Sequence, residues 1–149
     1  MAKKEVVKKV VAKKVAVKKS VFKKSDMLKL LEIFKEIKKL MKAYEPPFSA
    51  RVDIEGKYDL WSEKTVKAFG REYDSMMFVS IIIQSGYVGF YYLPIYAEPG
   101  LSKNFNADFM KLLKGKSCFH VKGLNKDTLS QIAKALKIGY TGYKKLKWI

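Results

Sequence analysis

The sequence predicts an α+β fold in which an antiparallel sheet of about five to six strands is covered by helices from the two ends of the chain. Three observations support this prediction. Helical periodicity of apolar residues occurs near both ends, β-branched and aromatic residues concentrate between them, and short turn signals separate the intervening segments. Strands that follow one another through short turns pair antiparallel, so helices from both ends can cover one face of their sheet.

The first predicted helix begins at Ser25 or Asp26, because either side chain can cap a helix N-terminus. Pro46 and Pro47 end it, since proline cannot continue a helix. Its apolar residues recur at spacings of three and four and form one buried stripe. This stripe consists of Met27, Leu30, Leu31, Phe34, Ile37, Met41 and Tyr44.

The middle of the chain is typical of β-strands. Residues 49–61 predict two short strands around the turn Glu55-Gly56. A further strand is predicted near Thr65–Phe69. Residues 76–96 predict two long strands around Gln84–Gly86, because this stretch is rich in β-branched and aromatic residues.

The last third of the chain predicts a short helix, a strand and a second long helix. The short helix runs from Asn106 to Leu113 and is stopped by Gly115. Ser117–Val121 predicts the strand. The long helix starts at Asn125, and its apolar stripe consists of Leu129, Ile132, Ala133, Leu136, Tyr140 and Tyr143.

Residues 1–25 differ in composition from the rest of the chain. They hold ten Lys and one Glu, in lysine pairs that recur every five residues. This spacing leaves no apolar face on a helix or a strand, and lysines four residues apart repel each other on a helix. We therefore predict a disordered lysine-rich arm, residues 1–25, and one folded domain, residues 26–149. The arm lysines are Lys3, Lys4, Lys8, Lys9, Lys13, Lys14, Lys18, Lys19, Lys23 and Lys24.

A block of basic residues at a chain terminus is typical of an arm that neutralises the phosphates of DNA or RNA. A solubilising tail and contact with anionic lipid headgroups are the alternatives. No apolar run approaches the roughly 20 residues of a membrane span, and no secretory signal is evident. One cysteine excludes an internal disulfide. A cytoplasmic protein is therefore expected.

The only cysteine and the only histidine, Cys118 and His120, lie in one predicted strand. Their side chains then share a face, but they start about 6.5–7 Å apart and stand parallel. Two ligands do not complete a zinc site, and no third group is evident that would orient His120 for nucleophilic catalysis. A structural role is expected for both residues, and no catalytic constellation is predicted. A Cys118-dependent enzyme is the alternative.

Four carboxylates around the first predicted hairpin are weak candidates for metal ligands: Asp53, Glu55, Asp59 and Glu63. Antiparallel pairing places some of them on opposite faces, which favours a solvated turn over a metal site. No cofactor is predicted from these residues.

One aromatic strand offers a different kind of surface. Its two faces carry Tyr87, Tyr91 and Leu93 on one side and Val88, Phe90 and Tyr92 on the other. An aromatic sheet face can stack nucleic-acid bases. The RNA-recognition signature is absent, however, and two long helices need a sheet face to cover. Core packing is therefore favoured for this strand.

Four stretches of the sequence, residues 56–64, 84–96, 112–124 and 135–149, resemble the YdhG-like domain family. The resemblance covers about residues 27–149. The family is a bacterial group, largely of unknown function, and the resemblance implies an α+β fold with an antiparallel sheet. One member is described as a frataxin-like intracellular iron chaperone, so the resemblance also implies iron as a ligand.

Two hypotheses result. The first is a non-enzymatic binding protein whose lysine-rich arm contacts nucleic acid without sequence specificity. The alternative is an iron chaperone. The first predicted helix bears on this alternative, because it carries Glu32 and Glu36 among five lysines and is net positive. Hard cations need clustered oxygen ligands and are disfavoured beside ammonium groups.

Overall fold

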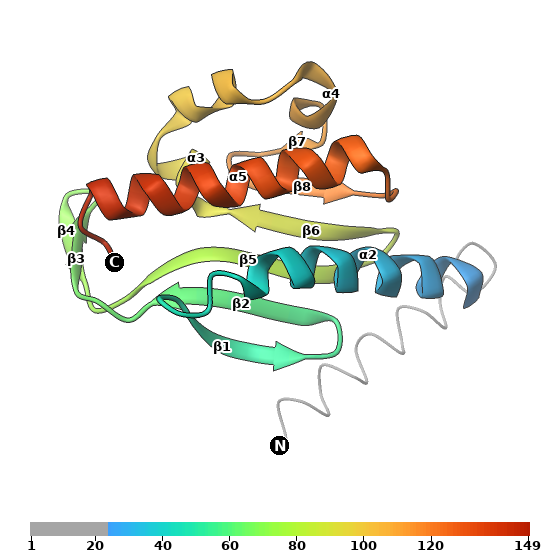
Figure 1. Ribbon diagram of the computed structural model, residues 1–149, viewed down its shortest axis with the longest axis horizontal. Coiled ribbons are helices and arrows are strands. Elements are labelled where there is room, and N and C mark those ends of the chain that lie inside the picture. The colour runs from blue at the N-terminus through green and yellow to red at the C-terminus, as the bar shows by residue number, and fades with distance from the viewer. Residues whose placement is uncertain (1–23) are drawn as a thin grey trace.

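The computed structural model describes residues 24–149 and has the predicted α+β architecture. Six strands form one sheet: β1 (Ser49–Ile54), β2 (Lys57–Ser62), β5 (Met76–Gln84), β6 (Tyr87–Tyr92), β7 (Leu113–Lys114) and β8 (Cys118–Val121). They lie in the order β1-β2-β5-β6-β8-β7, and every neighbouring pair is antiparallel. The two long helices lie side by side over one face of this sheet (Figure 1).

Within the described residues the first long helix is α2 (Lys24–Lys42), which includes two residues ahead of Asp26. Lys24 and Ser25, which the prediction assigned to the arm, belong to this helix. Asp26 lies in the first turn, where a carboxylate is favoured by the positive end of the helix dipole. The buried side chains follow the expected spacing, with Ile33 as an addition to the predicted stripe. They are Leu30, Ile33, Phe34, Ile37 and Met41.

The second long helix, α5 (Lys126–Lys145), is capped by Asn125, whose side chain accepts a hydrogen bond from the Thr128 backbone N–H at 2.7 Å. Two tyrosine hydroxyls tie this helix to the sheet. Tyr92 Oη donates to the Ala135 carbonyl at 2.6 Å, and Tyr143 Oη donates to the Met77 carbonyl at 2.6 Å. Because both tyrosine side chains are buried, these bonds satisfy polar groups that would otherwise be costly to bury.

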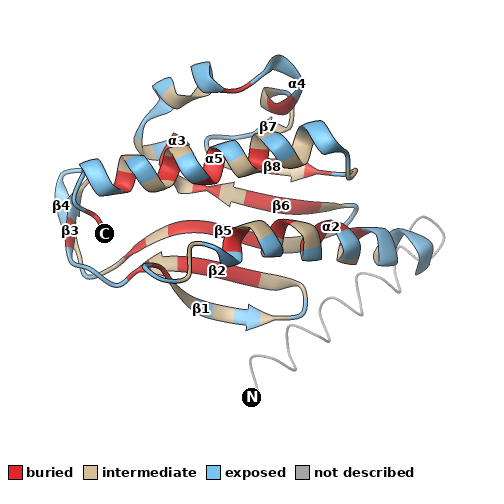
Figure 2. Cartoon of the chain, in the orientation of Figure 1, coloured by how far each residue is buried: buried red, intermediate tan, exposed pale blue. Residues whose placement is uncertain are grey.

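The core lies between the sheet and the two helices, and buried residues concentrate along the central strands (Figure 2). It is rich in aromatic rings. Phe48 stacks on Phe78 with ring centroids 4.1 Å apart, and Phe109 stacks on Phe119 at 4.4 Å. Burying one such side chain contributes about 1.5–3 kcal/mol, so this layer accounts for much of the stability of the domain.

The second of the two long predicted strands ends earlier than expected. Residues up to Tyr96 were predicted to be extended, but β6 ends at Tyr92 and Leu93–Ala97 form the short helix α3. Pro94 explains the difference, because proline has no N–H to donate to a strand ladder and its fixed φ suits the first turn of a helix. Leu93 therefore does not share a strand face with Tyr87 and Tyr91.

The strand predicted near Thr65–Phe69 exists as β3 (Val66–Ala68), but it lies outside the main sheet. It pairs with β4 (Arg71–Tyr73), a strand that the sequence did not predict. Phe69 and Gly70 form the turn of this hairpin, with φ of 51° and 76°. A two-residue turn with both φ values positive matches the right-handed twist of its strands, and Phe69 adopts that conformation without the freedom of glycine.

The segment between α3 and β8 contains the 3-10 helix η1 (Pro99–Asn104) and α4 (Ala107–Met110). The predicted start of the short helix is confirmed, because Asn106 caps α4 by accepting the Phe109 backbone N–H at 2.8 Å. The helix is shorter than predicted. Leu113, which was expected to be helical, already belongs to β7, at the edge of the sheet.

Candidate functional site

The two faces of the sheet have different surroundings. Alternation along β6 directs Val88, Phe90 and Tyr92 toward the helices, where all three are buried. Tyr87 and Tyr91 point to the opposite face and are only half-buried. We call this opposite side the open face, because within residues 24–149 both long helices pack on the other side (Figure 1). Core packing was predicted for the whole strand, and on this face the prediction is wrong.

The Tyr91 side chain extends over Gly89 on the open face. A Cβ atom added to Gly89 would sit 2.9 Å from Cε2 of the Tyr91 ring, so the ring occupies the space above this glycine. The Gln84 side-chain amide donates to the Tyr91 hydroxyl at 3.4 Å. Partial burial is the main cause of the raised pKa of the Tyr91 hydroxyl, and neighbouring Cys118 adds to the effect.

A stacked pair of rings lies beside it. Tyr87 of β6 and His120 of β8 have centroids 3.8 Å apart and planes inclined by 11°. The register places His120 opposite Gly89 and Cys118 opposite Tyr91, so the single histidine and cysteine share the open face, as expected for a strand. Desolvation lowers the pKa of His120, and the charges of Lys114 and Lys122 lower it further. The imidazole is therefore neutral near pH 7.

Cys118 does not have the features of a nucleophile. Burial raises the pKa of its thiol, whereas a nucleophilic cysteine needs a lowered pKa. The imidazole of His120 stacks on Tyr87 instead of activating the thiol. The structural role expected for Cys118 stays a prediction.

Basic residues border the rings. Lys57 lies in the same cross-strand row as Gly89 and His120, and Lys114 is paired with Cys118 at the β7–β8 end. Lys122 directly follows β8, two residues after His120, and its charge lowers the pKa of His120. The open face thus combines flat aromatic surface with several lysines.

The end of the open face near β1 is covered by its own side chains. The guanidinium of Arg51 lies 4.4 Å from the centroid of the Trp61 ring and pairs with Glu63. The Trp61 ring is therefore already in contact with a cation. By contrast, among residues 24–149 no cation or ring is stacked on Tyr91, which leaves Tyr91, Tyr87 and His120 as the accessible part of this surface.

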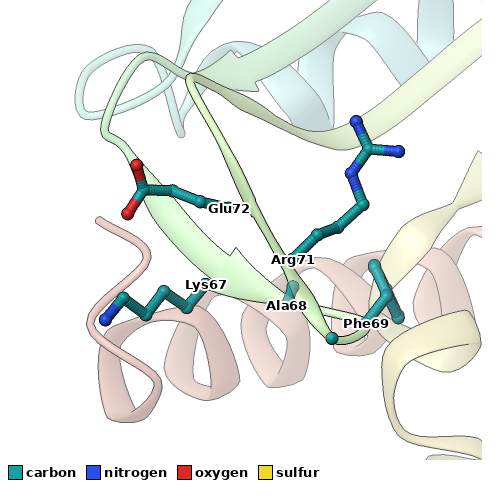
Figure 3. Close-up of a pocket in the computed structure, with 6 residues that line it drawn as sticks. Lys67, Ala68, Phe69, Arg71 and Glu72 are labelled. Atoms are coloured by element: carbon teal, nitrogen blue, oxygen red, sulfur yellow. The ribbon is translucent and has the colours of Figure 1, made fainter.

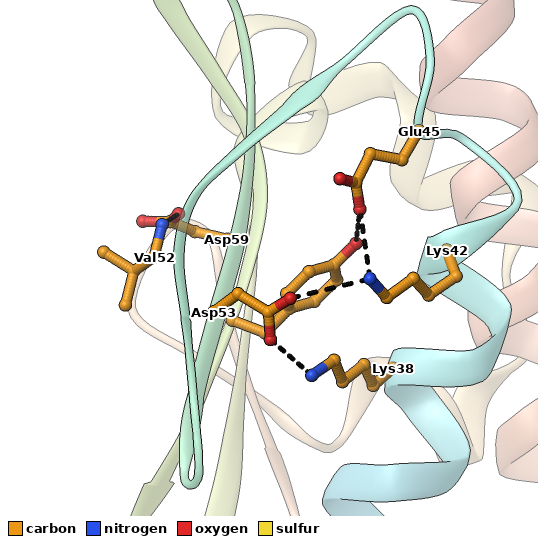
Figure 4. A network of polar contacts seen from close by, with 7 residues as sticks. Lys38, Lys42, Glu45, Val52, Asp53 and Asp59 are labelled. Carbon is orange, nitrogen blue, oxygen red and sulfur yellow. Dashed lines mark hydrogen bonds and ion pairs between the residues drawn. The ribbon is translucent and has the colours of Figure 1, made fainter.

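The four candidate metal ligands are not brought together. Asp53 and Asp59 point to opposite sides of the β1–β2 hairpin (Figure 4). Asp53 receives a hydrogen bond from Lys38 at 2.5 Å and pairs with Lys42 at 3.5 Å. The hydrogen bond from Lys38 is the main cause of the lowered pKa of Asp53. This carboxylate therefore ties β1 to α2.

The remaining carboxylates of the hairpin are also separated from one another. Asp59 is buried and accepts the backbone N–H of Val52 at 2.8 Å, and Glu63 pairs with Arg51. Glu55 lies exposed in the turn. Within residues 24–149, no group of three or more His, Cys, Asp or Glu side chains could hold a metal ion.

Of the ten predicted nucleic-acid-binding lysines, only Lys24 lies within the described residues, at the exposed start of α2. The other nine lysines, and the predicted disorder of residues 1–23, lie outside them. Within residues 24–149, no helix combines the length and the apolar content that a bilayer span requires.

A pocket of about 580 Å³ lies against the β3–β4 hairpin and is lined by residues 67–72. Figure 3 shows Lys67 and Glu72 on one side of the hairpin, Arg71 on the other and Phe69 at the turn. The lining contains no imidazole, thiol or hydroxyl group. The open face is therefore the stronger candidate for a functional site.

Comparison with known proteins adds no relative, since no protein-family model, curated protein or solved structure matches the chain. The resemblance to the YdhG-like family stays a prediction from sequence.

The sequence indicated Tyr87, Tyr91, Cys118 and His120 individually, but it did not predict that the four residues lie together on one face of the sheet. The stack of Tyr87 on His120 joins two strands that are separated by more than twenty residues of chain. Gly89 was the available signal, because a glycine between aromatic residues of a strand often marks a place where another group approaches the backbone closely.

Proposed function

We propose that the protein is a non-enzymatic, cytoplasmic nucleic-acid-binding protein whose lysine-rich arm contacts phosphates without sequence specificity. The excess of positive over negative charge carries this proposal. Residues 24–149 hold 22 Lys and Arg against 13 Asp and Glu, and residues 1–23 add nine lysines and one glutamate. The ion pairs within residues 24–149 engage only Lys38, Lys39, Lys42, Arg51 and Lys111 among these cations.

Counterion release is the physical basis of the proposed binding. Each lysine that neutralises a phosphate releases a condensed cation, so the logarithm of the affinity falls linearly with the logarithm of the salt concentration. Such contacts read no base sequence. They suit a chain whose positive charge is spread over an arm and a domain surface.

A salt titration tests the arm directly. The full-length protein is compared with a full-length variant in which the nine lysines of residues 3–23 are glutamine. If all nine contact phosphates on duplex DNA, the log–log slope should become less steep by up to about 8. Equal slopes for the two proteins would show that the arm does not bind nucleic acid.

The iron-chaperone alternative rests on the family resemblance alone. Asp53, Asp59 and Glu63 already have partners within the domain, so no described feature favours iron. A titration with ferrous iron, monitored by the NMR signals of the hairpin carboxylates, tests the iron-chaperone alternative. Selective broadening of those signals would support it.

A further inference from the structure

We infer that the open face binds single-stranded nucleic acid by stacking one unpaired base on Tyr91 and another against the Tyr87–His120 pair. This inference rests on the proposed function, because it names the form of nucleic acid that the folded domain recognises. It goes beyond the arm, whose phosphate contacts do not distinguish single strands from duplexes.

The position of the Tyr91 ring is the first argument. The ring lies against the backbone at Gly89, where any larger residue would displace it, and Gln84 holds its hydroxyl. The Tyr91 side chain is thus positioned on the open face, where it is only half-buried. Half-buried aromatic side chains on a sheet face are the arrangement on which RNA-binding sheets stack bases.

The Tyr87–His120 pair supplies a second aromatic surface. The Tyr91 ring reaches over Gly89, which pairs with His120, so it lies next to the Tyr87–His120 pair, and successive bases of one strand can contact the two in turn. His120 is neutral near pH 7, and its contact with Tyr87 is a ring stack. An extended strand of nucleotides can therefore follow β6 across the sheet.

The positive charges of the open face favour a negatively charged polymer as its ligand. Lys57, Lys114 and Lys122 border the rings and have no carboxylate partner within residues 24–149. The one acidic side chain in the neighbouring row, Asp59, is buried and hydrogen-bonded to backbone. A negatively charged ligand with planar groups thus complements the face, whereas an acidic peptide would match the lysines but not the flat rings.

The geometry favours a single strand over a duplex. In a duplex the base surfaces are stacked on one another and cannot reach the protein rings, whereas unpaired bases can. Stacking tolerates any base, which agrees with binding that lacks sequence specificity.

The test measures the affinity of full-length protein for a labelled oligothymidylate by fluorescence anisotropy. Tyr91→Leu should weaken binding about 5- to 150-fold, the loss expected for one stacked base. Tyr91→Phe should retain most of the affinity, because the ring remains. Tyr96→Leu is the matched control, since Tyr96 is an exposed tyrosine on α3, outside the open face.

Two readouts separate stacking from a general loss of structure. The salt slope of Tyr91→Leu should equal that of wild type, because no phosphate contact is removed, and its affinity for a duplex of the same length should be unchanged. Wild-type protein should also bind an abasic strand of the same length more weakly than oligothymidylate. This second comparison needs no variant and holds even if Tyr91→Leu fails to fold.

Equal affinities for the abasic strand and for oligothymidylate would overturn the inference and leave the proposed function standing, because phosphate binding alone would then explain the data. Failure of wild-type protein to bind any nucleic acid at low salt would overturn both.

Discussion

The contact between α5 and the sheet leads to a prediction about two glycines of the same helix. A Cβ atom at Gly139 would lie 2.8 Å from Cγ of Pro94, 2.9 Å from Cε1 of Phe78 and 3.1 Å from Cε1 of Tyr92. Carbon atoms prefer separations of about 3.5–4.0 Å. All three neighbours are buried, so the helix itself has to move away from the sheet. At Gly142, by contrast, nothing lies within 4 Å of an added Cβ.

The magnitudes can be compared directly. Each Gly→Ala change gains about 1 kcal/mol of helix propensity. At Gly142 this gain should appear in full. At Gly139 overpacking costs about 1–3 kcal/mol, and a shift of α5 also lengthens the hydrogen bond from Tyr92 to the Ala135 carbonyl. Because the helix-propensity gain is common to both, Gly139→Ala should be less stable than Gly142→Ala by about 1–3 kcal/mol.

Urea denaturation of both variants, followed by far-ultraviolet circular dichroism, provides the measurement. A difference of about 2 kcal/mol separates the two midpoints by about 1 M urea for an m-value near 2 kcal/mol/M. Equal midpoints would refute the reasoning, because they would show that α5 does not lie this closely against Pro94 and Phe78.

Three further changes test the open face and the core. Gly89→Ala should change the free energy of unfolding by less than about 0.5 kcal/mol, because the Tyr91 ring can move away from the open face. The affinity of this variant for oligothymidylate should fall severalfold. An unchanged affinity would contradict the proposed role of the Tyr91 ring. Tyr143→Phe removes a hydrogen bond to a main-chain carbonyl of β5 and should destabilise the domain by about 1 kcal/mol in urea denaturation, whereas Tyr96→Phe should not. Because the pKa of His120 is lowered in the folded state, the unfolded chain binds this proton more readily, so stability should decrease as the pH falls below about 6.5 toward the folded-state pKa. In urea denaturation across that range, His120→Gln should flatten this decrease, and an identical pH profile for the variant would argue against it.

The fold class was predictable because local patterns and the final structure agree for the long elements. The apolar spacing of three and four identified α2 and α5, and Asn125 marked the start of α5. The β-branched residues of 76–84 identified β5. In these segments one periodicity extends over many residues, so the signal is strong.

The short elements were missed where tertiary contacts decide the structure. β4 contains Arg71, Glu72 and Tyr73 and shows no apolar alternation, so only its pairing with β3 makes it a strand. β7 has two residues and exists through its ladder with β8. The helix at Leu93–Ala97 is different, because the sequence contains its signal. Pro94 favours the first turn of a helix, whereas the aromatic residues before it favour a strand.

The candidate site was only half predictable. Alternation placed Tyr87 and Tyr91 on one face of their strand. Which face is uncovered depends on both long helices packing on the same side of the sheet, and the stack with His120 depends on β6 and β8 being neighbours. Neither fact follows from the residues of the strand itself.

The edges of the sheet bear on the proposed binding to nucleic acid. Proteins bound side by side on one nucleic acid meet at high local concentration, and an unpaired strand edge can then recruit a neighbour into a continuous sheet. Here β1 has a register irregularity between Ala50 and Val52 and exposes Arg51 and Asp53, while β7, at the opposite edge, has only two residues, of which Lys114 is exposed. Neither edge offers a long, flat, apolar template, so copies bound side by side on one strand, as the proposed function implies, would not fuse their sheets.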